Sequence, residues 1–396
     1  MPHSQIGTDA SRNPPSPSRA HLSELARLFL KLGTIAFGGP PAHIAMMEDE
    51  VVSRRNWLTR EQFLDFLGAA NLIPGPTSTE MAIHIGRVMA GWPGLLVSGI
   101  CFILPATVMV GILAWAYVRY GSLPQVAGIL YGVKPIVIAI IVQAVFKLAR
   151  TAVKSVWLSV LGIAAVVATA MGTDQLLVLA AGGAVAGLAY WIRVKEKQGC
   201  LLAPALSKGS GVAGASIASM PFSMGSLFLV FLKIGAVLFG GGYVLVALLR
   251  ANLVSGLGWI TERQLLDAVA MGQVTPGPIS TAATFIGYLV AGFPGAAVAT
   301  IAIFLPAFVL VAISGPLVPR LRQSPLAGAI LDGVNVAALA LIAVVTWQLF
   351  RSAVVDWPTL LLFALSFLLL VRYRVNSVWL VLGGAAVGLG VLFLRR

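Results

Sequence analysis

The sequence predicts an all-α membrane protein that crosses the bilayer many times and consists of two homologous halves. Hydrophobic residues make up 58% of the chain and charged residues only 10%, apolar runs of membrane-spanning length recur, and one set of motifs occurs twice. In hydrocarbon, only helices and closed barrels satisfy every backbone group. Because the apolar runs are continuous rather than alternating, we expect a helical bundle and reject a barrel.

The duplication follows from motifs that recur at a constant separation. Phe37-Gly38-Gly39 in the first half corresponds to Phe239-Gly240-Gly241 in the second, and Gly242 extends the second cluster. The triplets Pro74-Gly75-Pro76 and Pro276-Gly277-Pro278 keep the same separation (276 − 74 = 202). Internal repeats of this kind are typical of secondary transporters.

Composition divides the chain into four parts. Residues 1–21 are polar and rich in Ser and Pro, lack the apolar core of a signal peptide, and predict a disordered cytoplasmic tail. Residues 22–194 and 222–396 form the two transporter repeats. Residues 195–221 hold lysines, glycines and serines, which predicts a linker that could also serve as a weak extra crossing.

Each half is expected to contribute six apolar spans, so the protein has about 12 to 13 transmembrane segments, including broken or re-entrant helices. In the first half the expected spans are 22–46, 62–91, 93–119, 127–148, 156–171 and 175–192. In the second half they are 222–249, 264–292, 294–315, 326–350, 357–371 and 376–394.

Basic residues lie mainly in short loops, which is typical of cytoplasmic loops and argues against nucleic acid as a partner of this chain, despite its net charge of +13. The loop containing Lys147, Arg150 and Lys154 is basic, whereas the equivalent loop of the second half is neutral. This opposite bias predicts an inverted repeat. Inversion requires either an extra crossing within 199–221, which leaves the N-terminus cytoplasmic, or re-entrant hairpins, which place it outside; the basic tail favours the first.

Lys31 and Lys233 occupy equivalent positions inside apolar spans, shortly before the glycine clusters. An ammonium group in hydrocarbon is costly, so such lysines usually face a polar cavity or a partner. Alternatively, each extends to the membrane interface. Since matched positions of an inverted repeat surround one pseudo-twofold axis, we predict that both lysines serve a shared central site.

The glycine clusters and the Pro-Gly-Pro triplets predict interruptions of the helices. Glycine clusters free backbone N–H groups that can bind an anion, although tight helix packing is the alternative. In each triplet the first proline ends one helix and the second begins another, whose hydroxyl-rich N-terminus suits an oxyanion; a surface helix–loop–helix is the alternative. The predicted substrate-binding residues are Lys31, Gly38, Gly39, Pro74, Gly75, Pro76, Thr77, Ser78, Thr79, Arg87, Lys233, Gly240, Gly241, Gly242, Pro276, Gly277, Pro278, Ser280 and Thr281.

Glu80, His84 and Arg87 share one helix face after the first triplet and have uncharged equivalents in the second half. Arg87 could hold the anion, and Glu80 or His84 could carry a proton, although His84 could equally be a packing residue. For His43 and Lys134 a structural role is favoured. We find no spacing of metal ligands and no enzyme or nucleotide-binding motif, so we expect no metal, no cofactor and no enzymatic activity.

These motifs resemble the chromate ion transporter family in its long, two-domain form. The matching segments, spread over residues 22 to 394, are Phe37-Gly38-Gly39-Pro40, Ala42-His43-Ile44, Trp57-Leu58, Pro74-Gly75-Pro76, Leu104-Pro105, Phe239-Gly240-Gly241-Gly242-Tyr243, Trp259, Pro276-Gly277-Pro278, Thr284-Phe285-Ile286-Gly287-Tyr288 and Leu305-Pro306. The resemblance implies a cell inner-membrane protein that exports chromate with proton coupling and confers chromate resistance. A sulfate or other oxyanion importer or exchanger is the nearer alternative, and a non-transporting scaffold or sensor the more distant one. Formation of a homodimer is left open.

Overall fold

The computed structural model describes residues 21–121, 123–197, 222–239, 242–314, 324–373 and 375–394, with the side chains of 195–197 left out. Within these ranges all regular secondary structure is helical. The predicted tail at 1–21 and linker at 195–221 lie almost entirely outside the described residues, as do Gly240 and Gly241. The prediction of an all-α protein is confirmed.

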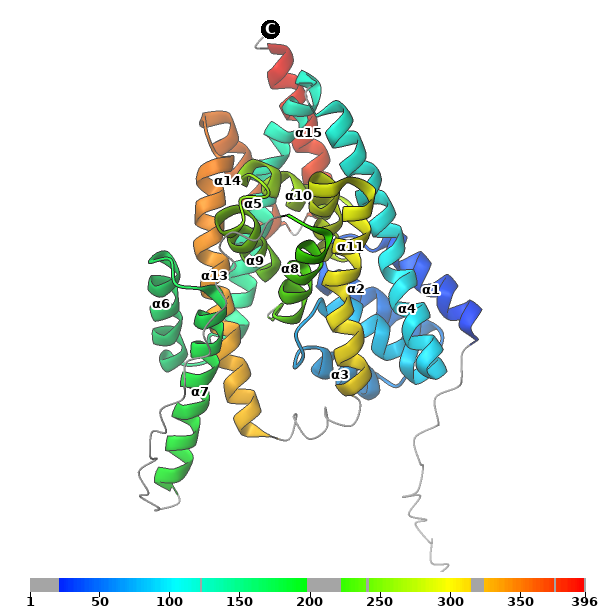
Figure 1. Ribbon diagram of the computed structural model, residues 1–396, viewed down its shortest axis with the longest axis vertical. Coiled ribbons are helices and arrows are strands. Elements are labelled where there is room, and N and C mark those ends of the chain that lie inside the picture. The colour runs from blue at the N-terminus through cyan, green and yellow to red at the C-terminus, as the bar shows by residue number, and fades with distance from the viewer. Residues whose placement is uncertain are drawn as a thin grey trace, which may run out of the picture.

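The described parts of the two halves contain corresponding helices in the same order, except that the second half has an additional short helix, η3 (Figure 1). The first half comprises α1 (Leu22–Ile35), α2 (Pro40–Glu48), the π-helix η1 (Asp49–Arg54), α3 (Arg60–Ala70), α4 (Thr77–Tyr120), α5 (Pro124–Ala152), α6 (Val156–Ala170) and α7 (Gln175–Lys197). The second comprises α8 (Met224–Ala236), α9 (Val244–Leu249), the π-helix η2 (Arg250–Gly256), α10 (Glu262–Val274), the 3₁₀-helix η3 (Ile279–Thr281), α11 (Ala282–Ser314), α13 (Pro325–Ala353), α14 (Trp357–Arg372) and α15 (Ser377–Leu394).

Six of the described helices are long and apolar enough to cross a membrane, and four shorter helices are also apolar. The long ones lie within α4, α5, α7, α11, α13 and α15. The predicted segment count included broken helices, and the structure contains such interruptions at residues 36–39, at the described residues 237–239 and 242–243, and at both Pro-Gly-Pro triplets. The chain is therefore a multi-pass helical membrane protein.

The long helices α4 and α11 each bend at a glycine. Gly91 and Gly292 have φ of +64° and +62°, a left-handed conformation that favours glycine. On either side of the first bend, Gly86 and Gly94 pack so closely that a Cβ on one would overlap the carbonyl oxygen of the other. Each long helix is therefore two helices that turn against one another.

The start of α3 and the start of α10 are stabilised by the same capping interaction. The Thr59 hydroxyl accepts the Gln62 N–H at 3.2 Å, and the Gln62 side chain accepts the Thr59 N–H at 3.0 Å. Thr261 and Gln264 repeat this exchange at 3.2 and 2.8 Å. A reciprocal cap satisfies two backbone donors that the helix itself cannot, so these sequence positions specify both helix starts.

The two halves exchange their last helices. α6 and α7 of the first half pack on α13 of the second, while α14 and α15 pack on α5. Gly132 of α5 lies against the carbonyl oxygen of Gly384, and Gly333 of α13 against that of Gly182, so small residues allow the backbones to meet. Figure 1 shows that the equivalent helices α7 and α15 extend to opposite ends of the molecule.

Candidate anion-binding site

Each Pro-Gly-Pro hairpin is hydrogen-bonded to the helix break of the other half. The Gly75 N–H donates to the carbonyl oxygen of Leu238, just after α8, and the Gly277 N–H donates to that of Ala36, just after α1, both at 2.9 Å. These bonds relate the two halves symmetrically, because Ala36 and Leu238 are equivalent positions. The structure therefore places each predicted hairpin against the predicted helix break of the opposite half.

Glycine is required at the centre of both hairpins. Gly75 and Gly277 have φ of +153° and +92°. A Cβ on Gly277 would lie 2.7 Å from the Cβ of Ala106, and one on Gly75 would overlap Oε1 of Glu80. The hairpins thus need both the backbone freedom and the absence of a side chain.

Two helix N-termini begin directly after the hairpins without a side-chain cap. Pro76 precedes α4 and Pro278 precedes η3. The hydroxyl groups of Thr79 and Ser280 are buried and have no hydrogen-bond partner among the described residues. Uncapped N–H groups and unpaired hydroxyl donors at a positive dipole end can bind an oxyanion.

The first glycine break contacts side chains of both halves, His43 from its own half and Tyr243 from the other. Gly38 and Gly39 both have positive φ, +105° and +76°. The His43 ring nitrogen Nε2 lies 3.0 Å from the carbonyl oxygen of Ala36, and it must donate, since a carbonyl can only accept. The Tyr243 hydroxyl lies 3.6 Å from where a Cβ on Gly39 would be. Pro40 lacks an N–H, so α2 offers fewer donors at its start than α4 does.

Glu80 is fully buried, and neither carboxylate oxygen has a hydrogen-bond partner among the described residues. It lies beside Gly75, inside the first hairpin. Burial of an isolated carboxylate charge is very unfavourable, whereas a protonated carboxyl group is tolerated. One turn later, His84 stacks on Phe66 with ring centroids 5.8 Å apart, and its Nε2 has no partner within the described part of the chain.

Arg87 connects the two halves. Its guanidinium group donates to the carbonyl oxygen of Val311 at 2.7 Å and to that of Ala312, near the end of α11. It also lies over the ring of Trp92, 4.9 Å from the centroid. Cations favour the negative C-terminal end of a helix, so this position of Arg87 stabilises the contact between α4 and α11. Its role as an anion ligand stays a prediction.

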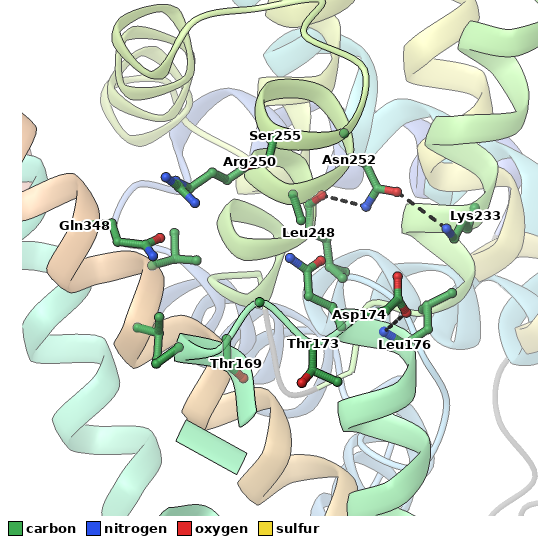
Figure 2. Close-up of a pocket in the computed structure, with 17 residues that line it drawn as sticks. Thr169, Thr173, Asp174, Leu176, Lys233, Leu248, Arg250, Asn252, Ser255 and Gln348 are labelled. Atoms are coloured by element: carbon green, nitrogen blue, oxygen red, sulfur yellow. Dashed lines mark hydrogen bonds between the residues drawn. The ribbon is translucent and has the colours of Figure 1, made fainter. Parts of the chain in front are cut away.

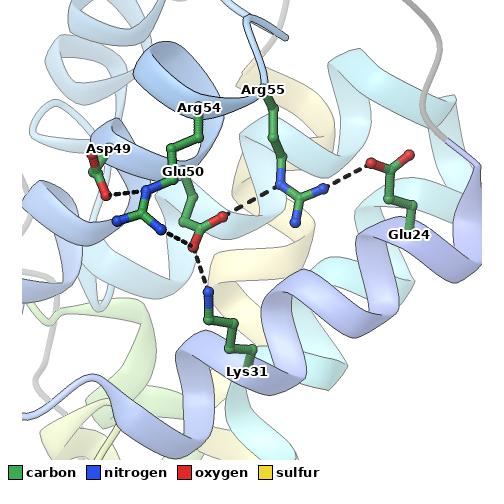
Figure 3. Close-up of polar contacts among 6 residues, drawn as sticks. All are labelled: Glu24, Lys31, Asp49, Glu50, Arg54 and Arg55. Carbon is green, nitrogen blue, oxygen red and sulfur yellow. Dashed lines mark hydrogen bonds and ion pairs between the residues drawn. The ribbon is translucent and has the colours of Figure 1, made fainter.

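The two predicted lysines have different partners rather than a common one. Lys31 Nζ lies 2.6 Å from Glu50, within a network of charged side chains from α1 and η1 (Figure 3). Hydrogen bonding from Lys31 holds the pKa of Glu50 below its ordinary value, and the opposing effect of burial is smaller. Lys233 Nζ lies 3.5 Å from the side-chain oxygen of Asn252. A central site shared by both lysines therefore stays a prediction.

A buried charged cluster between the halves was not predicted as a functional site. Asp267 of α10 is fully buried, with Lys134 Nζ 2.9 Å from Oδ1, and the Tyr117 hydroxyl donates to Oδ2 at 2.9 Å. The ammonium contact is an ion pair whose angle falls outside hydrogen-bond geometry, so Oδ1 lacks a hydrogen bond. The sequence signals were the acidic pair Asp65 and Asp267 at equivalent positions of predicted spans, and Lys134 inside another span, for which a structural role was favoured.

Comparison with known proteins extends these observations. A model of the chromate transporter family matches residues 23–188 and again residues 225–389, which confirms the duplication. The chromate transport protein of Cupriavidus metallidurans is 35% identical over 371 residues, 92% of each chain. The chromate transport protein of Pseudomonas aeruginosa is 32% identical over 400 residues, 96% of this chain and 95% of that one. No solved structure matches the chain.

Proposed function

The chain belongs to the chromate transporter family, and we propose that it exports chromate from the cytoplasm across the inner membrane, coupled to protons, and so confers chromate resistance. In this proposal the two halves are an inverted repeat with a cytoplasmic N-terminus. The opposite directions in which α7 and α15 extend support the inversion (Figure 1).

The reciprocal hydrogen bonds of Gly75 and Gly277 are the observation that carries the proposal. They hold two uncapped helix N-termini next to interrupted helices from the opposite half. In a membrane such interruptions persist only where protein or a cavity surrounds them. We propose that the N–H groups of these two N-termini, with hydroxyl donors from Thr79 and Ser280, bind a tetrahedral dianion together, because such an ion offers only acceptors.

Glu80 is the group that we assign to proton coupling. Its carboxyl group lies inside the first hairpin, so a negative charge there would repel an arriving dianion. Binding of a proton removes that charge, and loss of the proton favours release of the anion, so one proton moves outward with each dianion, and the membrane potential, negative inside, drives the remaining negative charge out of the cell. Proton binding and anion binding are therefore linked through the Glu80 side chain, without direct contact between the proton and chromate.

Cells that produce the protein are expected to grow at chromate concentrations that stop matched cells without it, and to accumulate less labelled chromate. Export lowers the internal concentration, so both effects must occur together. Unchanged accumulation, with the protein shown to be inserted in the membrane, would contradict the proposal. Inhibition of chromate flux by sulfate, with net movement inward, would instead identify the importer or exchanger.

The Glu80→Gln variant is expected to lose chromate flux driven by a pH gradient in vesicles, down to background. Glutamine has the same shape but cannot release a proton, so the anion can still bind and exchange. Counterflow of labelled against unlabelled chromate, without a gradient, should therefore persist. The matched control is His84→Gln; if it alone loses the gradient response, the coupling assignment belongs to His84.

A further inference from the structure

A cavity of about 350 Å³ lies between the α6–α7 turn, α8, η2 and α13. None of its lining residues belongs to the Pro-Gly-Pro hairpins. Figure 2 shows Arg250 and Gln348 on one side of it and Lys233 with Asn252 on the other. A water molecule occupies roughly 30 Å³ in the liquid. The cavity can therefore hold a tetrahedral oxyanion together with several of its hydrating waters.

Three polar groups of this cavity lack the partners that their chemistry requires. Nε of Arg250 is buried and without a hydrogen bond among the described residues, although Arg250 pairs with Glu262 through Nη2. Oε1 of Gln348 is also buried and unpaired, but it is an acceptor and needs a donor, such as a water that hydrates an anion. Lys233 has no ion pair within the described part of the chain, only the contact with Asn252. Buried donors that stay unpaired are costly, which indicates that a ligand with acceptor atoms completes the site.

In the equivalent region of the first half, a carboxylate neutralises the charge of the corresponding lysine. There Lys31 pairs with Glu50, at the position that Asn252 occupies in the second half (50 + 202 = 252). Arg250 stands where the first half has Glu48 (48 + 202 = 250), and its partner Glu262 stands where the first half has Arg60 (60 + 202 = 262), so this ion pair is reversed in sign rather than lost. The exchange of Glu50 for Asn252, by contrast, removes one negative charge next to the lysine.

Asp174 is the acidic residue that also lines the cavity. Its Oδ1 accepts the N–H groups of Leu176 and Leu177, at 2.9 and 3.2 Å, so it caps the start of α7. A carboxylate engaged with backbone donors at a helix N-terminus has part of its charge compensated there. It therefore leaves Lys233 without a direct counterion.

We propose that this cavity is a vestibule that receives a small divalent oxyanion at Lys233 and Arg250, and that Asn252 keeps it open by leaving Lys233 uncompensated. The vestibule exists in the second half alone, because Glu50 closes the corresponding position of the first half with an ion pair. The two ends of the transport path thus differ in charge although the halves share a fold. The inference rests on the proposed function in that the vestibule serves the transported anion.

The test compares Asn252→Glu with Asn252→Gln, two variants of equal size that differ in charge. Glutamate should pair with Lys233 as Glu50 pairs with Lys31, and so raise the KM for chromate flux by about tenfold or more over the glutamine variant, equivalent to at least ~1.4 kcal/mol of lost binding. The maximal rate should change little, because the hairpins are untouched. The difference should shrink at high ionic strength, since screening weakens the interaction of charges with a partly open site.

Equal KM values for the two variants, with wild-type flux present, would overturn the vestibule and leave the proposed function intact. If the wild-type protein carries no chromate flux, the proposed function fails, and the vestibule is judged by equilibrium dialysis of the purified protein with labelled chromate. In that experiment weaker binding to Asn252→Glu than to Asn252→Gln supports the vestibule, and equal binding overturns it. Elution as one sharp species in detergent verifies that both variants are folded.

Discussion

Replacement of Gly277 by valine is expected to abolish transport. The residue has φ of +92°, and its N–H forms the bond to Ala36 that holds the second hairpin against the first helix break. A side chain in this left-handed conformation costs roughly 1–2 kcal/mol, and overpacking against Ala106 adds about 1–3 kcal/mol. The hairpin must shift, so the helix N-terminus after Pro278 is displaced from the position that the proposed anion site requires. Flux of labelled chromate into vesicles measures the effect.

Two other glycines separate conformational strain from the close contact. Gly292 has φ of +62° with open space where a Cβ would lie, and Gly111 has open space and an ordinary helical conformation. We expect flux to decrease in the order Gly111→Ala, Gly292→Ala, Gly277→Ala, with the first near wild type. A Gly277→Val protein that is correctly inserted and transports at the wild-type rate would show that the hairpins are not the binding site.

Replacement of Asp267 by asparagine is expected to be among the most destabilising single changes, by about 3–5 kcal/mol. Asparagine can still accept the Tyr117 hydroxyl, but the ammonium group of Lys134 is then left without a counterion, and only 13% of that side chain is exposed. The free-energy cost of an uncompensated charge buried between helices exceeds the free energy gained from the hydrogen bonds around it. Thermal unfolding in detergent measures the loss.

The double variant Lys134→Met with Asp267→Asn tests the reason for that loss. It removes the charge and keeps an acceptor for Tyr117, so it should be more stable than Asp267→Asn alone. The exposed pair Lys154 and Asp332 is the matched control, and Asp332→Ala should cost less than about 1 kcal/mol. If the double variant is no more stable than the single one, the cluster is not held together by charge compensation.

Local interruptions of the helices could be predicted from the sequence because proline and glycine determine backbone conformation by themselves. Gly38 and Gly75 take positive φ values. The last three predicted spans of each half coincide closely with α5, α6, α7, α13, α14 and α15, whereas 22–46, 62–91, 222–249 and 264–292 each cover more than one helix. The reciprocal caps of α3 and α10 are likewise local, since Thr59 and Gln62 are three residues apart. Interactions between residues that lie within one helical turn can therefore be predicted from the spacing of residue types in the sequence.

Contacts between distant parts of the chain could not be predicted in this way. Arg87 shares a helix face with Glu80, from which we predicted that Arg87 could hold the anion and Glu80 could carry a proton; the carbonyl partners of Arg87 in α11, more than two hundred residues later, left no signal in the sequence. Asp267, Lys134 and Tyr117 come from three separate helices, so no spacing in the sequence relates them. Backbone carbonyl acceptors in particular cannot be identified from the sequence, because residues of every type have one.

The exchange of terminal helices between the halves has a consequence for biosynthesis. The surface of α5 that carries Gly132 packs against Gly384 of α15, 252 residues later in the chain (384 − 132 = 252). The ribosome therefore delivers a first half that is inserted but unfinished, and its glycine face stays exposed to lipid until α15 has been synthesised. Maturation of α5 depends on a helix that is made much later than α5 itself.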